Sequence, residues 1–187
     1  MYPSWILSVV AGLAGAAQAI RYQRDSSDPF QIYAFGDGIG GVPLISSGKS
    51  AYIGNYELLD DPEAAPVVFT ASTSGVWVGT PNKTDLADSS DPTWSDLKLY
   101  VPAASATTHT VGLVNATTAK TTSLQTSGFD FYGTFVYVTG ATGGMDMLWY
   151  AVPSGTDGVY ALRWNTTGDD TDGSIPITLK SSPPSNA

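Results

Sequence analysis

The side chains of this 187-residue chain that could do acid–base chemistry are nearly all carboxylates, since it has 17 acidic residues, one histidine and no cysteine. Two carboxyl groups suffice to hydrolyse a glycosidic bond, one acting as acid and the other as base or nucleophile. Asp37, Asp130 and Asp146 lie nearest to apolar, strand-like runs. A glycoside hydrolase with an Asp pair is therefore one hypothesis. Asp130 stands between two phenylalanines, however, and on a strand it would point to the opposite face.

His109 is the only histidine, so any Ser/His/Asp mechanism would have to use it. The surrounding residues 106–110 are polar and typical of an exposed loop, and the chain contains no G-x-S-x-G sequence. One histidine cannot form the usual two- or three-His zinc site, and the lack of cysteine removes thiolate chemistry. We interpret His109 as a solvent-facing side chain and predict no catalytic residue, no metal and no cofactor.

Residues 36–41, Gly-Asp-Gly-Ile-Gly-Gly, fit the G-x-G-x-x-G pattern of dinucleotide-binding folds. That chemistry needs a helix directly after the glycines, because the helix N-terminus binds the pyrophosphate. Residues 42–45, Val-Pro-Leu-Ile, lead instead into a Ser/Gly turn. The glycines therefore predict an irregular or bulged turn that needs positive φ.

The acidic segment 168–173 contains Asp169, Asp170 and Asp172. In the calcium loop of helix–loop–helix proteins the bidentate glutamate would fall at Leu179, so that motif fails. A calcium ion held in another geometry and a solvated acidic turn both stay open, and we favour the turn.

Aromatic side chains suggest a second hypothesis, a carbohydrate-binding module, because sugar rings stack on exposed tryptophan and tyrosine. Trp94, in the loop between Pro92 and Asp96, is the tryptophan that we expect to be exposed, and Trp77 is the other candidate. The remaining aromatic residues are better explained by core filling or cross-strand pairs.

An N-terminal signal peptide is predicted over residues 1–19. Its apolar run is too short to span a bilayer and ends in Ala17-Gln18-Ala19, a small-x-small cleavage pattern. Cleavage between Ala19 and Ile20 would release an extracellular protein, with no membrane attachment after removal of the signal.

Three N-x-[ST] sequons, each among polar or small residues, fit that location. They begin at Asn82, Asn115 and Asn165, where we predict exposed loops or strand ends that carry glycans.

The formal net charge is −9, and no Lys/Arg cluster exists to neutralise phosphates. Nucleic acid and anionic membranes are therefore not expected as partners, whereas polysaccharide or cell-wall glycan is possible on chemical grounds. After the signal, the length suits a single domain over residues 20–180. The polar residues 181–187 are expected to be a disordered tail.

Period-two patterning dominates, and long helical periodicity is missing. The sequence predicts an all-β sandwich or barrel of about ten short, mostly antiparallel strands. The candidate strands are 31–35, 42–46, 50–54, 67–71, 76–79, 97–101, 110–114, 134–139, 147–152, 159–164 and 175–179. Segments 43–54, 67–79 and 147–164 resemble one another as hairpins, so a small propeller-like repeat is the alternative.

The block from Ile32 to Leu44, with Tyr-Ala-Phe-Gly-Asp-Gly-Ile-Gly-Gly-Val-Pro, and the following Ala51-Tyr52-Ile53-Gly54 resemble the opening of a group of small secreted proteins from filamentous fungi. The resemblance covers residues 32–54. It implies an extracellular, fungal setting and carries over no activity, since the group has none established.

These observations favour a secreted, acidic, non-catalytic glycoprotein that acts at the cell surface, the cell wall or a host interface. The carbohydrate-binding module and the Asp-pair glycoside hydrolase are the two alternatives. The sequence leaves the oligomeric state open.

Overall fold

The computed structural model of the chain describes residues 28–72, 74–84, 86–87, 90–165 and 172–185. The predicted signal peptide and its cleavage site at Ala19 and Ile20 lie outside these residues. The described strands are β1 (Tyr33–Gly36), β2 (Ile39–Ser46), β3 (Ala51–Gly54), β4 (Ala65–Ala71), β5 (Trp77–Pro81), β6 (Leu97–Pro102), β7 (Gly112–Val114), β8 (Leu124–Gln125), β9 (Phe129–Tyr132), β10 (Phe135–Thr139), β11 (Met145–Asp146), β12 (Trp149–Pro153), β13 (Val159–Trp164) and β14 (Ile175–Lys180).

Helical structure in this part of the chain is limited to two three-residue 3-10 helices, η1 (Tyr56–Leu58) and η2 (Thr118–Lys120). Neither of them has the length or the apolar character that a bilayer-spanning helix requires. The prediction of an all-β fold is thus confirmed.

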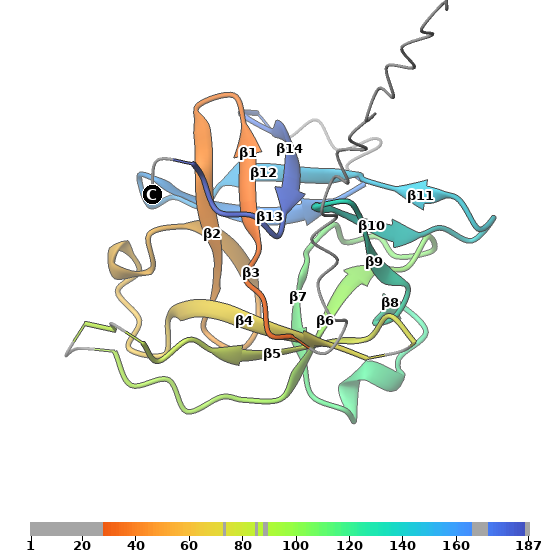
Figure 1. Cartoon of the computed structure of the whole chain (residues 1–187), viewed down its shortest axis with the longest axis horizontal. Helices are drawn as coiled ribbons and strands as arrows, with labels where there is room; N and C mark the ends of the chain where they lie inside the picture. The colour runs from red at the N-terminus through yellow and green to blue at the C-terminus, as the bar shows by residue number, and fades with distance from the viewer. Residues whose placement is uncertain (1–27, 73, 85, 88–89, 166–171, 186–187) are drawn as a thin grey trace, which may run out of the picture.

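The centre of the fold is a closed ring of six antiparallel strands. The pairing order is β1-β2-β3-β13-β12-β14, and β14 pairs back with β1. Closure satisfies the backbone groups that an open sheet would leave unpaired at its edges. In Figure 1, β1 and β2 (orange) and β14 (dark blue) stand upright, and β12 and β13 (lighter blue) run across them. The sequence predicts either a sandwich or a barrel, and the closed ring is a barrel.

A second circuit of pairings shares β2 and β3 with the ring. β2 also pairs with β4, and the pairing continues through β5 and β6 to β7. β7 returns to the start of β3, because Ser50 forms a bridge with Gly112 and the Leu113 N–H donates to the Lys49 carbonyl at 2.6 Å. β4 and β5 form the lower layer in Figure 1.

The three similar segments of the sequence are hairpins, as predicted. They form β2–β3, β4–β5 and β12–β13. They are not the blades of a propeller, because β3 also pairs with β13 and β2 also pairs with β4, which joins the hairpins into one network.

The glycine-rich residues 36–41 form the turn and bulge of the β1–β2 hairpin. Gly38 lies in the turn at φ +69°. The register shifts between Ala34 and Phe35, and Gly41, at φ +87°, is the extra residue of β2. β2 follows at once, so no helix is present to bind a pyrophosphate. The predicted bulged turn is confirmed.

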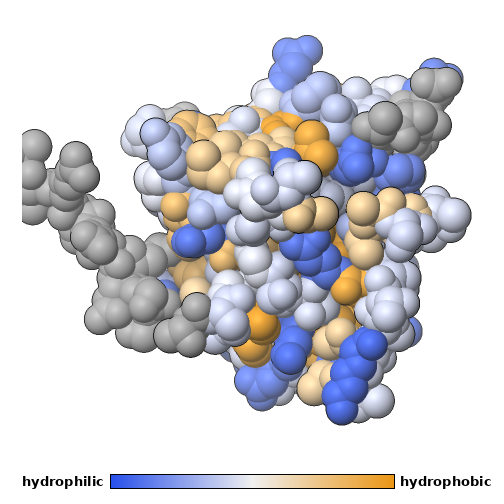
Figure 2. All heavy atoms as spheres, turned by 90° about the vertical axis from the view of Figure 1, so that its right-hand side faces the viewer, coloured by the Kyte–Doolittle hydropathy of each residue, from blue (hydrophilic) through white to orange (hydrophobic). Residues whose placement is uncertain are grey.

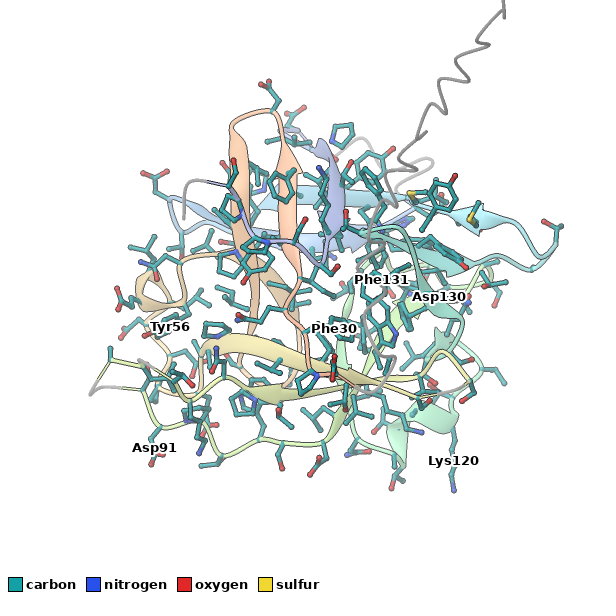
Figure 3. The ribbon with its side chains drawn as sticks, viewed as in Figure 1. Phe30, Tyr56, Asp91, Lys120, Asp130 and Phe131 are labelled. Carbon is teal, nitrogen blue, oxygen red and sulfur yellow. The ribbon has the colours of Figure 1, made fainter. Side chains whose placement is uncertain are left out.

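An aromatic cluster ties the segment before β1 to the second circuit. Phe30 and Phe69 exchange two backbone hydrogen bonds of 2.9 and 2.7 Å. The Trp77 ring centroid lies 4.8 Å from that of Phe30, 4.8 Å from that of Phe131 and 5.5 Å from that of Phe129. Figure 3 shows Phe30 and Phe131 next to each other between the layers. Trp77 is only 1% exposed and is the centre of this cluster.

Part of the predicted disordered tail, residues 181–187, has defined contacts. The Ser181 N–H donates to the Thr134 carbonyl at 2.9 Å. The Pro184 ring lies so close to Gly41 that a Cβ there would meet it at 2.8 Å. These two residues thus contact the β1–β2 hairpin and the residues before β10, and residues 186 and 187 lie outside the described chain.

Replacing Trp77 by alanine is expected to lower the free energy of unfolding by about 3–5 kcal/mol, because it removes the centre of the aromatic cluster and leaves a cavity. Urea denaturation followed by tryptophan fluorescence measures this change. Tyr132→Ala is the matched control, since Tyr132 is 63% exposed and its loss should change stability by less than about 0.5–1 kcal/mol. Equal effects of the two substitutions would contradict the assignment of Trp77 to the core.

Candidate functional site

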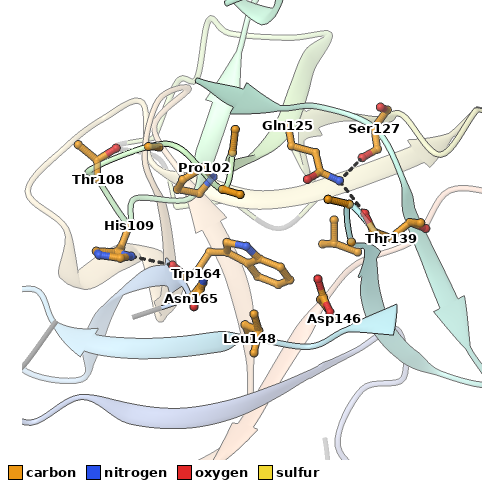
Figure 4. Close-up of a pocket in the computed structure, with 16 residues that line it drawn as sticks. Pro102, Thr108, His109, Gln125, Ser127, Thr139, Asp146, Leu148, Trp164 and Asn165 are labelled. Atoms are coloured by element: carbon orange, nitrogen blue, oxygen red, sulfur yellow. Dashed lines mark hydrogen bonds between the residues drawn. The ribbon is translucent and has the colours of Figure 1, made fainter. Parts of the chain in front are cut away.

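A cleft of about 570 Å³ opens where the strands outside the ring meet the end of β13 (Figure 4). Five segments that are far apart in the sequence line it: residues within 102–109, 125–127, 138–141, 146–148 and 164–165. Small-molecule sites typically measure about 300–1,000 Å³. The cleft is therefore large enough for a ligand of several rings or of one to three sugar units.

Apolar side chains form part of the cleft lining. Leu148, which is 39% exposed, and Val138 of β10 both line it. Figure 2 views the molecule from the side on which β10 and β11 lie, and its upper part shows orange side chains among blue ones. The cleft thus combines an apolar wall with polar groups.

Trp164 lies at the centre of the cleft (Figure 4). It is held from behind by Trp149, whose ring centroid is 4.5 Å away at 66°, and Trp149 is fixed in turn by its indole N–H, which donates to the Val136 carbonyl at 3.1 Å. Within the described chain the indole N–H of Trp164 has no hydrogen-bond partner. It is a fixed donor at the cleft surface.

Asp146 provides an acceptor in the same cleft. Its carboxylate lies against the backbone of Gly140, where any Cβ would collide with its Oδ2 atom. Among the described residues no hydrogen-bond or ionic partner contacts this carboxylate. Gly140 therefore makes room for Asp146, and the lone pairs of Asp146 are open to a ligand.

His109 and Gln125 complete the polar groups of the cleft. The Nδ1 atom of His109 lies 3.1 Å from the Trp164 carbonyl, and since a carbonyl only accepts, Nδ1 carries the proton and donates. In neutral His109, Nε2 is then an acceptor. The Gln125 amide nitrogen donates to the carbonyls of Ser127 and Thr139, at 3.2 and 3.0 Å, which leaves its Oε1 atom as an acceptor. The interpretation of His109 as merely solvent-facing is corrected, because it is half-buried and lines the cleft.

The three candidate carboxylates of the sequence do not form a pair. Asp37 lies in the β1–β2 turn. Asp146 pairs with Val138 of β10, whereas Asp130 pairs with the adjacent Tyr137 on the other side of that strand. Neighbouring residues of a strand point to opposite faces, so Asp130 and Asp146 lie on opposite faces of the small sheet. As predicted, Asp130 is exposed and points away from Phe129, which is buried.

The two tryptophans that the sequence nominated for sugar binding are both engaged elsewhere. Trp77 is buried in the aromatic cluster. Trp94 is half-buried rather than exposed, since its indole N–H donates to the Glu63 carbonyl at 2.8 Å and its ring covers Gly48. Neither of the two lines the cleft, and the tryptophan at the cleft is Trp164.

Two of the predicted glycosylation sites have a similar local geometry. The side-chain oxygen of Asn82 accepts from the Thr84 N–H at 3.1 Å, and that of Asn115 accepts from the N–H groups of Thr117 and Thr118 at 3.0 and 2.8 Å. All three bonds use the side-chain oxygen, so the amide nitrogen, to which a glycan is attached, is not the bonded atom. Asn165, with φ +46°, lies at the edge of the cleft.

The acidic segment 168–173 is described only from Asp172 onward, so the choice between a calcium loop and a solvated turn stays a prediction. In the part of the chain that is described, His, Asp and Glu side chains nowhere gather in groups of three or more that could hold a metal ion.

Sequence reasoning did not find the cleft. Trp164 is there only the end of a predicted strand, and Gln125 and Leu148 carry no motif. No family model, curated protein or solved structure matches the chain, so the assignment of a function depends on the geometry of the site.

Proposed function

We propose that this protein is a secreted, non-catalytic glycoprotein that binds a neutral saccharide in the cleft and acts at the cell surface, the cell wall or a host interface. The observation that carries the proposal is the pair of unpaired groups in the cleft, the Trp164 indole N–H and the Asp146 carboxylate.

A saccharide suits these groups because each hydroxyl can both donate and accept. One hydroxyl would donate to Asp146, and another would accept from Trp164. The apolar C–H face of the sugar would lie against Leu148, which is exposed at the cleft. A hydrogen bond to a charged group contributes about 1.5–3 kcal/mol and one between neutral groups about 0.5–1.5 kcal/mol.

The proposal is a binding protein rather than a glycoside hydrolase because of the distribution of carboxylates. Hydrolysis needs two carboxyl groups about 5–10 Å apart on either side of the scissile bond. Among the residues that line the cleft, Asp146 is the one carboxylate. Asp130 lies on the other face of the sheet and is already bonded to the Phe131 N–H at 2.7 Å.

Secretion is supported by the signal-like residues 1–19, the three sequons and the resemblance of residues 32–54 to small secreted fungal proteins. Polysaccharide or cell-wall glycan is the partner that fits both this location and the cleft.

Glycan-array screening followed by calorimetry tests the cleft, with cello-, laminari-, chito- and manno-hexaose as probes. All variants carry Thr167→Ala, which removes the Asn165 sequon and leaves the asparagine itself in place. Asp146→Ala should weaken binding of the best probe by roughly 10–100-fold, and Trp164→Phe, which keeps the ring and loses the N–H, by roughly 2–10-fold.

Asp130→Asn is the matched control, because it removes a carboxylate from the other face of the same sheet. It should leave the affinity unchanged. Wild-type affinity in Asp146→Ala, or the same loss in Asp130→Asn, would exclude the cleft as the site, and failure of every probe would exclude a neutral saccharide.

Expression of the full chain in a filamentous fungus or yeast tests secretion and glycosylation. The protein in the medium should begin at Ile20, and peptide-N-glycosidase treatment should convert the asparagine to aspartate in the peptides of Asn82 and Asn115. N-terminal sequencing and mass spectrometry give both readouts. Retention of the chain inside the cell, or an intact residue 1–19 segment, would be evidence against the proposed location.

A further inference from the structure

A second surface lies on the outer face of the sheet, away from the cleft. Tyr100 of β6 pairs with Gly112, Gly112 bridges Ser50, and Tyr52 of β3 pairs with Ala161 of β13. Two residues further on β13, Arg163 pairs with Tyr150 of β12. Residues that pair directly, or that are two apart on a strand, share a face. Three tyrosines therefore share one continuous face with Arg163.

Arg163 of β13 and Lys98 of β6, two residues before Tyr100, are the charged groups of this face, and Arg163 is the one that pairs with a tyrosine. It is half-buried, and its one side-chain hydrogen bond within the described chain goes to the hydroxyl of Thr110. No carboxylate in that part of the chain lies within salt-bridge distance of it, although the sequence has 17 acidic residues. A guanidinium has five N–H donors and is costly to remove from water without an anionic partner. Most of these donors are available to a ligand.

Tyr150 lies beside this charge, since it pairs directly with Arg163. The pKa of Tyr100 is raised by burial, and the positive charge of Arg163 opposes that rise. The Tyr100 ring lies over Gly112, where a Cβ would meet its Cε1 and hydroxyl at 3.0 Å. Small residues, Gly112, Ser50 and Ala161, thus form the floor between the tyrosines.

We propose that this surface, Tyr52, Tyr100, Tyr150 and Arg163, binds a short saccharide that carries a single oxyanion, with Arg163 as the anion contact and the tyrosines as contacts for the sugar ring. A carboxylate matches the planar fork of a guanidinium with two parallel hydrogen bonds. The ligand is therefore a hexuronate. A sugar sulfate has the same oxyanion chemistry, and the titration described below distinguishes the two.

The charge of the whole protein restricts the ligand further. With a formal net charge of −9 the chain repels polyanions, so a nucleic acid or a long polyuronate would not be attracted. Charges more than about 8 Å away are largely screened at physiological salt, so a ligand with one anionic group responds mainly to Arg163. Arg163 and Trp164 are adjacent on β13 and point to opposite faces, and this surface is therefore separate from the cleft.

NMR titration of the full chain with methyl glucuronide, methyl glucoside and glucose 6-sulfate tests the proposal. Methyl glucuronide carries a carboxylate at C5 where methyl glucoside carries a hydroxymethyl group, and the two probes are otherwise the same. Methyl glucuronide should bind at least about tenfold more tightly than methyl glucoside and should shift the resonances of residues around Arg163. Tighter binding of glucose 6-sulfate would identify a sulfate ester, and not a carboxylate, as the oxyanion.

Arg163→Gln should abolish the preference for methyl glucuronide, and Arg163→Lys should restore part of it. Tyr150→Leu, which keeps Arg163 and its bond to Thr110, should weaken the binding of both sugars, and it provides a second test if Arg163→Gln does not fold. Lys120→Gln is the control, since Lys120 is an exposed cation in η2 and is not one of the four residues of this surface (Figure 3). Asp146→Ala should have no effect, which separates this surface from the cleft.

Equal affinities for methyl glucuronide and methyl glucoside would overturn the proposal. So would a preference that survives in Arg163→Gln or that is lost in Lys120→Gln. Thermal unfolding midpoints of all variants show whether each loss is one of binding or of folding.

Discussion

The whole fold depends on the pairing of β2 with three other strands. Its first half pairs with β1, and its last residues pair with β3 on one side and β4 on the other. The Gly41 bulge allows the two halves to twist differently, as bulges do. Ser46, fully buried at the end of β2, donates to the Ser50 carbonyl at 2.8 Å and accepts from the Gly48 N–H at 3.0 Å. This turn joins the two circuits, so it must form for either to close.

Closure of the circuits determines where a ligand can bind. Their interior is filled by apolar side chains such as Ile53, Leu162 and Leu179, all at most 1% exposed. Space for a ligand is found outside, where the short strands β8 to β11 leave the ring and Trp164 ends β13. The rigid part of the cleft is therefore the Trp149–Trp164 contact. Residues 103–106, of which three are alanines, form one wall of the cleft.

Much of the fold follows from the sequence, and the cleft does not. All eleven predicted strands overlap observed ones, because each is a run of four or more residues, rich in β-branched, aromatic or other apolar side chains, between turn residues. The strands β8 and β11 have two residues each and carry no period, and β9, Phe-Asp-Phe-Tyr, is not among the predicted strands. Trp94 is predicted to be exposed for a similar reason. Its hydrogen-bond partner Glu63 is 31 residues away in the sequence, and no local pattern indicates that bond. The cleft is assembled from five such distant segments.

The two proposed surfaces select ligands of different charge, a neutral sugar in the cleft and an anionic one on the outer face. In the cleft, the open carboxylate of Asp146 would face any anionic sugar and repel it, whereas it accepts hydrogen bonds from a neutral one. On the outer face of β13, Arg163 has the reverse preference, and a neutral sugar would leave the guanidinium without its anion. Discrimination of this kind comes from the cost of the wrong ligand as much as from the fit of the right one. Arg163 and Trp164 are successive residues of β13 and belong one to each surface, so the alternation of side chains along this strand keeps the two surfaces apart.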